Sequence, residues 1–599
     1  MNRTLSAVFL LTFTAAIAHA TIKGGADKLI NQVAPTTNIG IQVIDLSTGA
    51  TLYQRNEARS FIPASNMKLF SDAAALMVLG PDYRFKNSLS TNASQLQQGI
   101  LKGNLYLYLS GDPSFSRDRL EILLASLKNW HISRIQGNVI IDSSHATVNP
   151  YAPGWMNEDL AYSYGAPLAP VMIDANRMVA TVNPADKAGE LAVVEVDDDS
   201  SSIVVNNQVK TKERGARCGV DFALDQTNHL TVRGCVAVGQ WAVQQKMAIR
   251  NPLLYAQGLI KQQLIKENIV LEGNVLLGKA PAGSMLLATD SSKPISQIMA
   301  DTLKPSDNLF ADSLFLHAAD KLHGSPVNWG EAQPLIKKFL QQQTGIELQQ
   351  AVLTDGSGLS RYDLLTPNQT VGLLRFLYDR FPLSYEYIAA LPISGRDGTL
   401  QRRFKKPDQQ DLVRAKTGTM TGVVSLSGYL YTANAHTLAF AMFINNVPGT
   451  SLSVSGRYRY LIDALCSYFL QQKPGNNTWV KVFSPQPRIK YQLSPTQAEQ
   501  QRGKQARWRR LESVVKQALS GQAVTVIYRG NELVLKDNQA DASRVLAALQ
   551  GLHKKYPFAV AVSAPNQPAG ASSLPLLWTE AVNLPAQTQR VWVIREAIG

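Results

Sequence analysis

The 599-residue chain has few of the residues that build metal and thiol sites. It contains three cysteines and eight histidines, and the histidines show no close spacing of the metal-ligand kind. It also lacks a Gly-x-Ser-x-Gly sequence, the turn that carries the nucleophile of α/β-hydrolases. These shortages argue against a metal site and against the chemistry of an α/β-hydrolase, and no cofactor is expected.

Long hydrophobic runs are absent after the N-terminus. Residues 1–20 carry Arg3, then an apolar run over 7–17, then Ala18-His19-Ala20, which is the pattern of a cleaved secretory signal. The run is too short to span a bilayer comfortably. We therefore expect a mature chain that begins near Thr21 and is periplasmic or secreted. An uncleaved anchor is the alternative.

The chain has no low-complexity tract, and it has fewer acidic than basic residues. It is 45% hydrophobic and 17% charged, as globular proteins are, and its length predicts three or four domains. The net charge is +14, and residues 478–599 hold 16 Lys and Arg against 7 Asp and Glu, or +9 of it. A basic exported protein favours anionic polymers or membrane surfaces. Nucleic acid is not expected, because no recognition motif is present.

The cysteines predict one disulfide. Cys218 and Cys235 lie 17 residues apart in a strand-rich region, and an oxidising compartment favours a bond between them. Cys466 lies in an apolar helical run and is expected to be a buried thiol. Three reduced core cysteines are the alternative.

Periodic patterns indicate two mixed helix-and-strand pieces around a β-rich insertion. Two strands joined by a turn at 47–49 are expected within 38–53, before a helix that begins near Ser65. Short strands dominate 87–282, which predicts one or two inserted, mostly β domains. The other main patterns are helices at 252–268, 294–323 and 456–470, and strands at 414–432 and 437–446.

The segment 474–477, Pro-Gly-Asn-Asn, predicts a domain boundary. Beyond it the patterns indicate a basic helix at 495–519, a hairpin with its turn at Gly530-Asn531, a second helix at 542–556 and two final strands. This predicts a small α/β module over 478–599. A Ser-x-x-Lys pattern inside its basic helix is interpreted as a solvated face.

The helix near Ser65 contains a lysine among apolar residues. In SFIPASNMKLFSDAAALMVLGP, Lys68 lies in the first turn of a helix with a broad apolar surface, three residues after Ser65. At that spacing the hydroxyl and the amine project on the same side. The simplest interpretation is a helix cap followed by a surface lysine. A buried ammonium would instead need a partner or a lowered pKa.

Two later motifs favour catalysis. Ser306-Asp307-Asn308 lies in an expected loop between helices, and Lys416-Thr417-Gly418 lies on an expected strand. Each motif is common alone, but the ordered set with Ser65-x-x-Lys68 is the signature of penicillin-binding proteins and serine β-lactamases.

Each residue of the set suits one step of acyl transfer. Ser65 is the expected nucleophile, and Lys68 can take its proton only as a neutral amine. We expect burial and the nearby charge of Lys416 to lower the pKa of Lys68. Ser306 can relay a proton to the leaving group, and Asn308 can donate a hydrogen bond to a substrate amide.

Substrate binding is assigned to the strand of the third motif. Lys416 and Thr417 can bind a terminal carboxylate, and Gly418 completes the motif. If this strand is an edge strand, it can pair with an extended peptide. The backbone N–H groups of Ser65 and Thr419 would form the oxyanion hole.

With these motifs in place, the chain resembles the low-molecular-mass class C penicillin-binding proteins, which are serine D-Ala-D-Ala carboxypeptidases and endopeptidases. The resemblance covers roughly 21–470. It implies a penicillin-binding, serine β-lactamase-like α/β domain over 21–86 and 283–473, a long β-rich insertion over 87–282, and leaves 478–599 as an extra α/β module. The motifs that carry it, beside the catalytic set, are SGDPS at 110–114, APGW at 152–155, the Cys218 and Cys235 pair, KPSDNLFAD at 304–312, DGSGLSR at 355–361 and AKTGTMTG at 415–422.

The resemblance implies peptidoglycan stem peptides as substrates and β-lactams as inhibitors. It also implies a pocket for the free amine end of a meso-diaminopimelate side chain, formed by Asp159, Tyr164 and Arg361, with Thr421 in place of the family's longer polar residue. Surface residues or an ordinary ion pair are the alternative for Asp159 and Arg361. The rival functions are a β-lactamase-like hydrolase, for which no deacylating Glu motif is visible, and a cell-wall-binding scaffold with a decayed site.

Overall fold

The computed structural model describes residues 23–92, 96–144, 149–433, 435–448 and 452–471, and short pieces at 515–517, 519, 524–529, 532–537, 558–563 and 591–596. Its internal contacts divide the chain into two units, Met1–Trp479 and Val480–Gly599. The expected signal segment 1–20, the boundary segment 474–477 and the cluster of basic residues at 502–510 lie outside the described residues.

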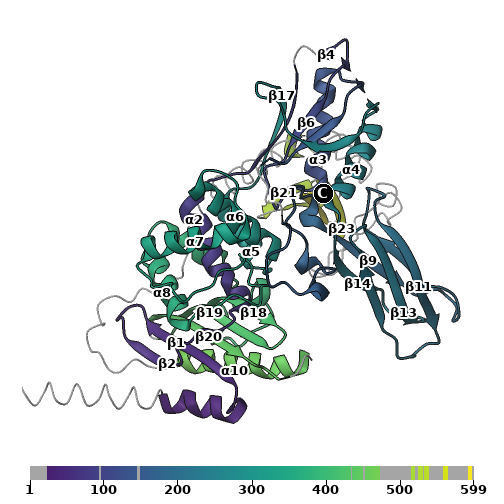
Figure 1. Ribbon diagram of the computed structural model, residues 1–599. Coiled ribbons are helices and arrows are strands. Elements are labelled where there is room, and N and C mark those ends of the chain that lie inside the picture. The colour runs from purple at the N-terminus through teal and green to yellow at the C-terminus, as the bar shows by residue number, and fades with distance from the viewer. Residues whose placement is uncertain are drawn as a thin grey trace, which may run out of the picture. The chain divides into compact units, whose positions relative to one another are not determined.

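A five-stranded antiparallel sheet joins the two ends of the first unit. The strand order is β18-β19-β20-β1-β2, so β1, near the start of the chain, pairs with β20 more than 390 residues later, as in Ile41 opposite Met442. In Figure 1 the purple β1 and β2 lie beside the green β19 and β20. The strands are β1 (Asn38–Asp45), β2 (Thr51–Arg55), β18 (Val413–Met420), β19 (Val423–Tyr431) and β20 (Thr437–Asn445). The predicted strand patterns at 38–53, 414–432 and 437–446 are confirmed.

Each face of this sheet packs against helices, because its strands are apolar on both sides. Along β20, Ala441 and Phe443 belong to the core formed with α2 and α5 to α9. Phe440 and Met442 belong to the core formed with α10 and the helix over 23–33. Helix α2 lies among α5, α6 and α7 on one side of the sheet, and α10 lies on the other (Figure 1). The helices are α2 (Lys68–Leu79), α5 (Ile295–Leu303), α6 (Asn308–His323), α7 (Trp329–Thr344), α8 (Pro367–Tyr378), α9 (Leu383–Ala390) and α10 (Leu452–Gln471).

The structure confirms the expected loop between two helices within 294–323. Helix α5 ends at Leu303 and α6 starts at Asn308. Between them Ser306 has a φ of +67°, a conformation that no continuous helix accommodates. The interruption places Ser306 in a loop between helices, as its motif predicts.

The first part of the insertion is mixed α/β rather than mostly β. It contains two sheets, β16-β8-β6-β3-β17 and β15-β7-β5-β4, with helices α3 (Arg117–Ala125) and α4 (Pro252–Lys266). Helix α4 matches a predicted helix, and α3 was not predicted. The strands are β3 (Lys86–Thr91), β4 (Leu96–Gln97), β5 (Ile100–Leu101), β6 (Leu105–Tyr108), β7 (Arg134–Ile135), β8 (Val139–Asp142), β15 (Val270–Leu271), β16 (Val275–Gly278) and β17 (Met285–Ser291).

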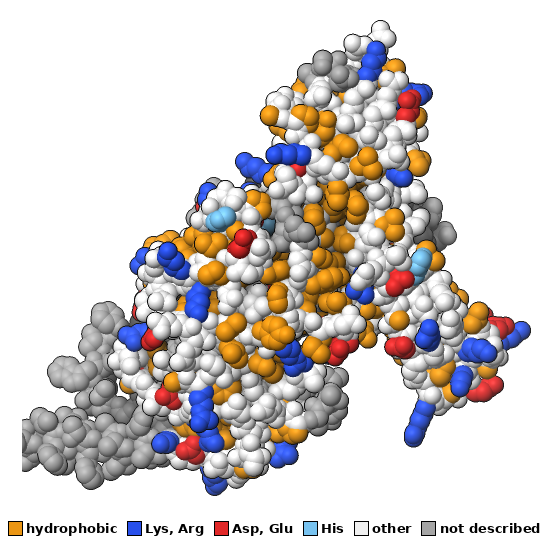
Figure 2. Space-filling model, viewed as in Figure 1, with side chains coloured by type: hydrophobic (Ala, Val, Ile, Leu, Met, Phe, Trp, Pro, Cys, Tyr) orange, Lys and Arg blue, Asp and Glu red, His pale blue; other side chains and the backbone are white. Residues whose placement is uncertain are grey.

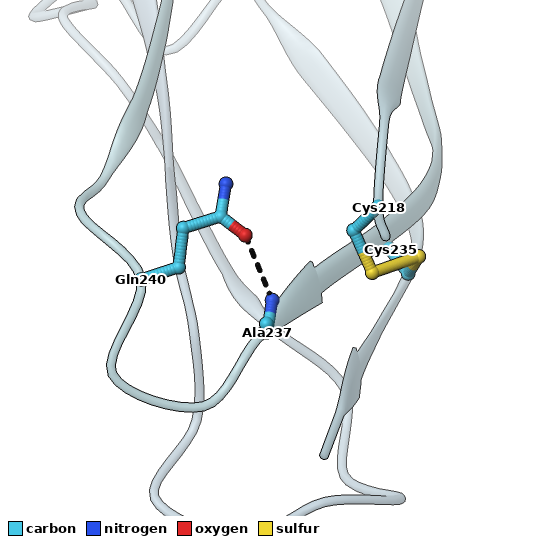
Figure 3. The surroundings of a disulfide bond; sticks show 4 residues. All are labelled: Cys218, Cys235, Ala237 and Gln240. Carbon is cyan, nitrogen blue, oxygen red and sulfur yellow. Dashed lines mark hydrogen bonds between the residues drawn. A yellow bond between two sulfur atoms is a disulfide. The ribbon is translucent and has the colours of Figure 1, made fainter. Parts of the chain in front are cut away.

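The second part of the insertion consists of two three-stranded sheets, β10-β9-β14 and β11-β13-β12. A disulfide joins Cys235 of β13 to Cys218, just before β12, as predicted, and Ala237 N donates to Gln240 Oε1 at 2.9 Å nearby (Figure 3). Cys466 is a buried free thiol. The strands are β9 (Arg177–Asn183), β10 (Val193–Val196), β11 (Val204–Lys212), β12 (Val220–Leu224), β13 (His229–Ala237) and β14 (Val243–Ala248).

The described residues of the second unit form one antiparallel sheet of order β21-β22-β24-β23, and a short helical piece at 515–517 lies within the predicted basic helix. The predicted hairpin is present, because β21 (Val524–Arg529) pairs with β22 (Glu532–Asp537). The predicted final strands are β23 (Phe558–Ser563) and β24 (Val591–Glu596). The predicted helix at 542–556 lies outside the described residues. Throughout the described parts of the chain, no helix combines the length and apolar character needed to cross a membrane.

Candidate active site

Ser65 and Lys68 lie at a helix start. A single 3-10 turn, η1 (Ala64–Met67), leads directly into α2, of which Lys68 is the first residue. Lys68 Nζ lies 3.1 Å from Ser65 Oγ. The short turn therefore places the amine within proton-transfer distance of the hydroxyl.

The Lys68 amine is fully buried and surrounded by acceptors. It lies 2.6 Å from Asn308 Oδ1 and 2.7 Å from the carbonyl of Ser357, in addition to Ser65 Oγ. Burial lowers the pKa of Lys68 to about 8, although nearby carboxylates oppose the shift. With this pKa, about a tenth of the amine is neutral at pH 7, far more than for an ordinary lysine. The three acceptors and the lowered pKa explain how a buried lysine is tolerated in an apolar helix.

The Ser306–Asn308 loop, at the start of α6, brings Asn308 to the Lys68 amine. Asp307 caps α6 by accepting a hydrogen bond from Phe310 N at 3.2 Å, which fixes Asn308 as the first helical residue. Asn308 Oδ1 faces Lys68, and its Nδ2 donates to the carbonyl of Tyr164 at 2.8 Å. The amide of Asn308 therefore bridges the lysine and the inserted region.

Lys416 brings the third motif to the site. It is fully buried on β18, and its Nζ lies 2.8 Å from both Ser306 Oγ and the carbonyl of Thr417. Burial and then the charge of Lys68 lower the pKa of Lys416 well below its usual value. The expected repulsion between the two lysines thus acts on Lys416, while burial is the main cause of the shift at Lys68. Thr417 Oγ1 donates to Thr399 Oγ1 at 2.8 Å.

Close backbone packing explains two glycines of the motifs. A side chain at Gly418 would meet Ser425 Oγ at 2.1 Å and the carbonyl of Pro63 at 2.9 Å. Gly358 has a φ of +79°, and a side chain there would meet the carbonyl of Ala64 at 1.9 Å. The Lys-Thr-Gly strand and the DGSG turn therefore press directly on the backbone that precedes Ser65.

Strand β18 lies at the edge of its sheet, with β19 as its neighbour, so the condition for pairing with a peptide is met. Thr419 lies on this strand opposite Val424. An edge strand leaves one row of backbone groups free for an added peptide strand. The expected role of the Ser65 and Thr419 N–H groups remains a prediction.

Three fully buried carboxyl groups surround the lysine, and none was singled out from the sequence. Asp312 accepts from Gly356 N at 2.8 Å, and Asp355 accepts from Gly358 N and Trp155 Nε1 at 2.6 and 2.8 Å. Asp355 thereby joins the DGSGLSR and APGW motifs. The motif strings were the available signal, but they did not indicate which side chains meet.

Asp72, the third of these carboxyl groups, lies one helical turn after Lys68 on α2 and is fully buried. Neither of its carboxyl oxygens has a hydrogen-bond partner among the described residues. Burial raises the pKa of Asp72 well above its usual range, and the charges of Lys68 and Lys416 oppose this. Its spacing from Lys68 in the sequence was the signal that could have revealed it.

Arg177 is a further residue that the sequence did not reveal. It lies at the start of β9 and forms an ion pair with Asp307 through both carboxylate oxygens. Its Nε donates to the carbonyl of Ser163 at 2.9 Å. The inserted region therefore holds the Ser306–Asn308 loop directly.

The residues expected to form the diaminopimelate pocket form two contacts. Tyr164 OH donates to Asp159 Oδ1 at 2.9 Å, and Arg361 Nη1 donates to the carbonyl of Thr421 at 2.6 Å. Burial raises the pKa of Asp159, and the charge of Arg361 opposes this, so the two residues are within electrostatic range. Within the described residues, no cluster of three or more His, Cys, Asp and Glu side chains could hold a metal ion.

Comparisons with known proteins agree with this geometry. The family model of the D-Ala-D-Ala carboxypeptidase 3 (S13) family matches residues 24–465. The D-alanyl-D-alanine carboxypeptidase DacB of Haemophilus influenzae is 30% identical over 424 residues, which are 70% of this chain and 87% of that protein. A D-alanyl-D-alanine carboxypeptidase of Actinomadura is 29% identical over 427 residues, covering 68% of this chain and 78% of that one.

Solved structures extend the similarity to three dimensions. The crystal structure of penicillin binding protein 4 from Haemophilus influenzae matches with a TM-score of 0.69 and 29% identity, over 75% of this chain and 99% of that one. The same protein complexed with a β-lactam matches with a TM-score of 0.65 and 28% identity, over the same shares of 75% and 99%. The chain described here belongs to the D-Ala-D-Ala carboxypeptidase 3 (S13) family.

Proposed function

We propose that the chain is a serine D-Ala-D-Ala carboxypeptidase and endopeptidase that acts on peptidoglycan stem peptides through an acyl-Ser65 intermediate. The observation that carries the proposal is the 3.1 Å approach of Lys68 Nζ to Ser65 Oγ, in a chain of this family. Neutral Lys68 takes the hydroxyl proton as Ser65 Oγ attacks the carbonyl carbon of the penultimate D-alanine. A β-lactam carbonyl is attacked in the same way.

Ser306 and Lys416 serve the leaving group. Lys68 returns the proton that it took from Ser65 to the departing amine through the Ser306 hydroxyl, whose Oγ lies 2.8 Å from Lys416 Nζ, and Lys68 is neutral again. The C–N bond then breaks, and the acyl group remains on Ser65 as an ester. Water attacks the ester, Lys68 accepts its proton, and the free acid and Ser65 hydroxyl are regenerated.

The remaining residues bind and orient the substrate. Lys416 and Thr417 bind the terminal carboxylate, Asn308 donates to the substrate amide, and the N–H groups of Ser65 and Thr419 bind the oxyanion. Gly418 permits the close approach of this strand to the turn before Ser65.

Asp159 binds the ammonium group of the diaminopimelate side chain. Tyr164 and Arg361 orient that site, and Thr421 contributes its backbone carbonyl to Arg361. The amine end of the side chain is thereby selected by charge.

The compartment follows from the substrate and from the N-terminal sequence. We propose that residues 1–20 are a cleaved signal and that the mature protein works in the periplasm.

The basic residues of 478–599, which carry +9, favour an anionic envelope polymer or membrane surface as a partner. A truncation after Pro474 is then expected to retain acylation by penicillin and to lose salt-sensitive binding to isolated envelopes. If the truncated and full-length proteins bind envelopes equally well at low salt, residues 478–599 do not provide the envelope contact. If the truncated protein loses acylation, the predicted domain boundary at 474–477 is wrong.

A fluorescent penicillin tests the proposed function against its rivals. We expect a covalent label that persists for many minutes, together with release of D-alanine from a pentapeptide that ends in D-Ala-D-Ala. Rapid turnover of the label indicates a β-lactamase instead, and no label indicates a scaffold.

A further inference from the structure

A cleft of about 610 Å³ opens beside the Ser306–Asn308 loop. Ser306 and Asn308 line it, together with residues of the inserted region on α3, β9 and β14. Asp159 and Arg361 are not among its lining residues. The cleft is therefore contiguous with the reacting groups, and Tyr164 is the one residue of the proposed diaminopimelate site that also lines it.

The charges in the cleft are mixed, and most are already paired. Arg177 pairs with Asp307, and Arg117 pairs with three further carboxylates, two of which line the cleft. Lys246 and Asp118 are exposed, and neither has an ion-pair partner within the described part of the chain. The charged lining residues are Arg117, Asp118, Asp174, Arg177, Asp197, Lys246 and Asp307.

This pattern suits a peptide that carries both signs of charge. Four carboxylates against three cations disfavour a polyanion. Sugar rings pack best on aromatic faces, and Tyr164 is the one aromatic residue among the described lining residues. Lys and Arg side chains also lie beside Asp and Glu on the β9–β14 part of the insertion, so this surface is not a uniformly basic one (Figure 2).

We propose that the cleft holds the second stem peptide of a cross-linked peptidoglycan substrate, with Lys246 facing a carboxylate and Asp118 an ammonium group of that peptide. This inference rests on the proposed function and adds the subsite that separates endopeptidase from carboxypeptidase substrates. In the endopeptidase reaction the bond between the D-alanine carbonyl and the diaminopimelate amine breaks. Water supplies OH to the carbonyl and H to the amine. A terminal D-alanine ends at the site, whereas a cross-linked substrate continues beyond it.

Charge reversal in the cleft tests the proposal. The measured quantity is the ratio of kcat/KM for a cross-linked peptide dimer to kcat/KM for a monomeric pentapeptide with the same acyl side. Because exposed charge pairs contribute modestly, we expect Lys246→Glu to lower this ratio about fivefold and Asp118→Asn about twofold. Lys261→Glu is the matched control, since Lys261 is exposed on α4 and does not line the cleft.

The ratio of the two kcat/KM values reports on the subsite alone, because a defect in folding or in the shared chemistry lowers both values together. A ratio in Lys246→Glu equal to that of the wild-type protein overturns the subsite, as does wild-type protein that cleaves the monomer but not the dimer. Wild-type protein that cleaves neither substrate overturns the proposed function as well. A fall in the ratio for Lys246→Glu but not for Lys261→Glu is the expected result.

Discussion

Arg177 of β9 clamps Asp307, the residue between Ser306 and Asn308, by donating to both of its carboxylate oxygens. The neighbouring Ser306 has a φ of +67°, which a non-glycine residue adopts only when the surroundings hold it there. The long insertion therefore holds the catalytic loop through the Arg177 side chain, in addition to the Tyr164 carbonyl that accepts from Asn308.

Loss of Arg177 is expected to impair catalysis more than stability. The two side chains of the pair are 23% and 13% exposed, so we expect Arg177→Ala to lower stability by about 1–2 kcal/mol, less than for a fully buried pair. We expect kcat for peptide hydrolysis to fall about tenfold with a small change in KM, since the loop relaxes around Ser306.

Arg177→Lys should restore part of kcat. Arg134→Ala, which removes a more exposed pair with Glu272, is the control. An unchanged kcat in folded Arg177→Ala contradicts the positioning role.

Acylation should depend on pH through Lys68. Its pKa of about 8 means that the neutral amine increases about tenfold per pH unit below that value and levels off above it. The second-order rate of acylation by a penicillin should therefore rise from about pH 6 and reach half of its plateau near pH 8. Lys68→Arg, which stays protonated, should lose at least about a thousandfold. A rate that is flat across this range excludes Lys68 as the base.

The disulfide should stabilise the inserted lobe locally. Closing a separation of 17 residues contributes about 3 kcal/mol in the loop-entropy account. The double variant Cys218→Ala and Cys235→Ala should show faster proteolysis between β11 and β14 while penicillin acylation persists. Intact-mass analysis of the denatured, unreduced wild-type protein should show one alkylated thiol, at Cys466. Alkylation of all three cysteines in that experiment rules out the bond.

Asp159 should select substrates with a free amine on the side chain of the third stem residue. Peptides with that amine should be cleaved about fivefold faster, by kcat/KM, than the same peptides acetylated there, because acetylation removes the charge. Asp159→Asn should abolish the preference, and Glu158→Gln, at the exposed neighbouring position, should keep it. An equal preference in Asp159→Asn and the wild-type protein removes Asp159 from the site.

Local spacing was sufficient to predict the centre of the site. Ser65 and Lys68 are three residues apart at a helix start, so their proximity follows from helix geometry alone. The strand of Lys416 was recognisable because an apolar, β-rich pattern surrounds it. The predicted disulfide needed only two cysteines in the same strand-rich region.

Other features depend on contacts that no local pattern contains. Arg177 and Asp307 are 130 residues apart, and Arg177 opens an ordinary alternating strand. The loop between α5 and α6 was predicted from its motif, but the φ of +67° at Ser306 was not. Helix α3 was missed since nine residues between strands give a short periodic signal.

The most direct test of the account is to locate the site of penicillin acylation by mass spectrometry in the wild-type protein and in Ser65→Ala. The account predicts one covalent adduct on Ser65 in the wild-type protein and none in the folded variant, whose melting temperature should be close to that of the wild type. An adduct of equal yield in Ser65→Ala, on Ser306, Ser513 or any other residue, contradicts it.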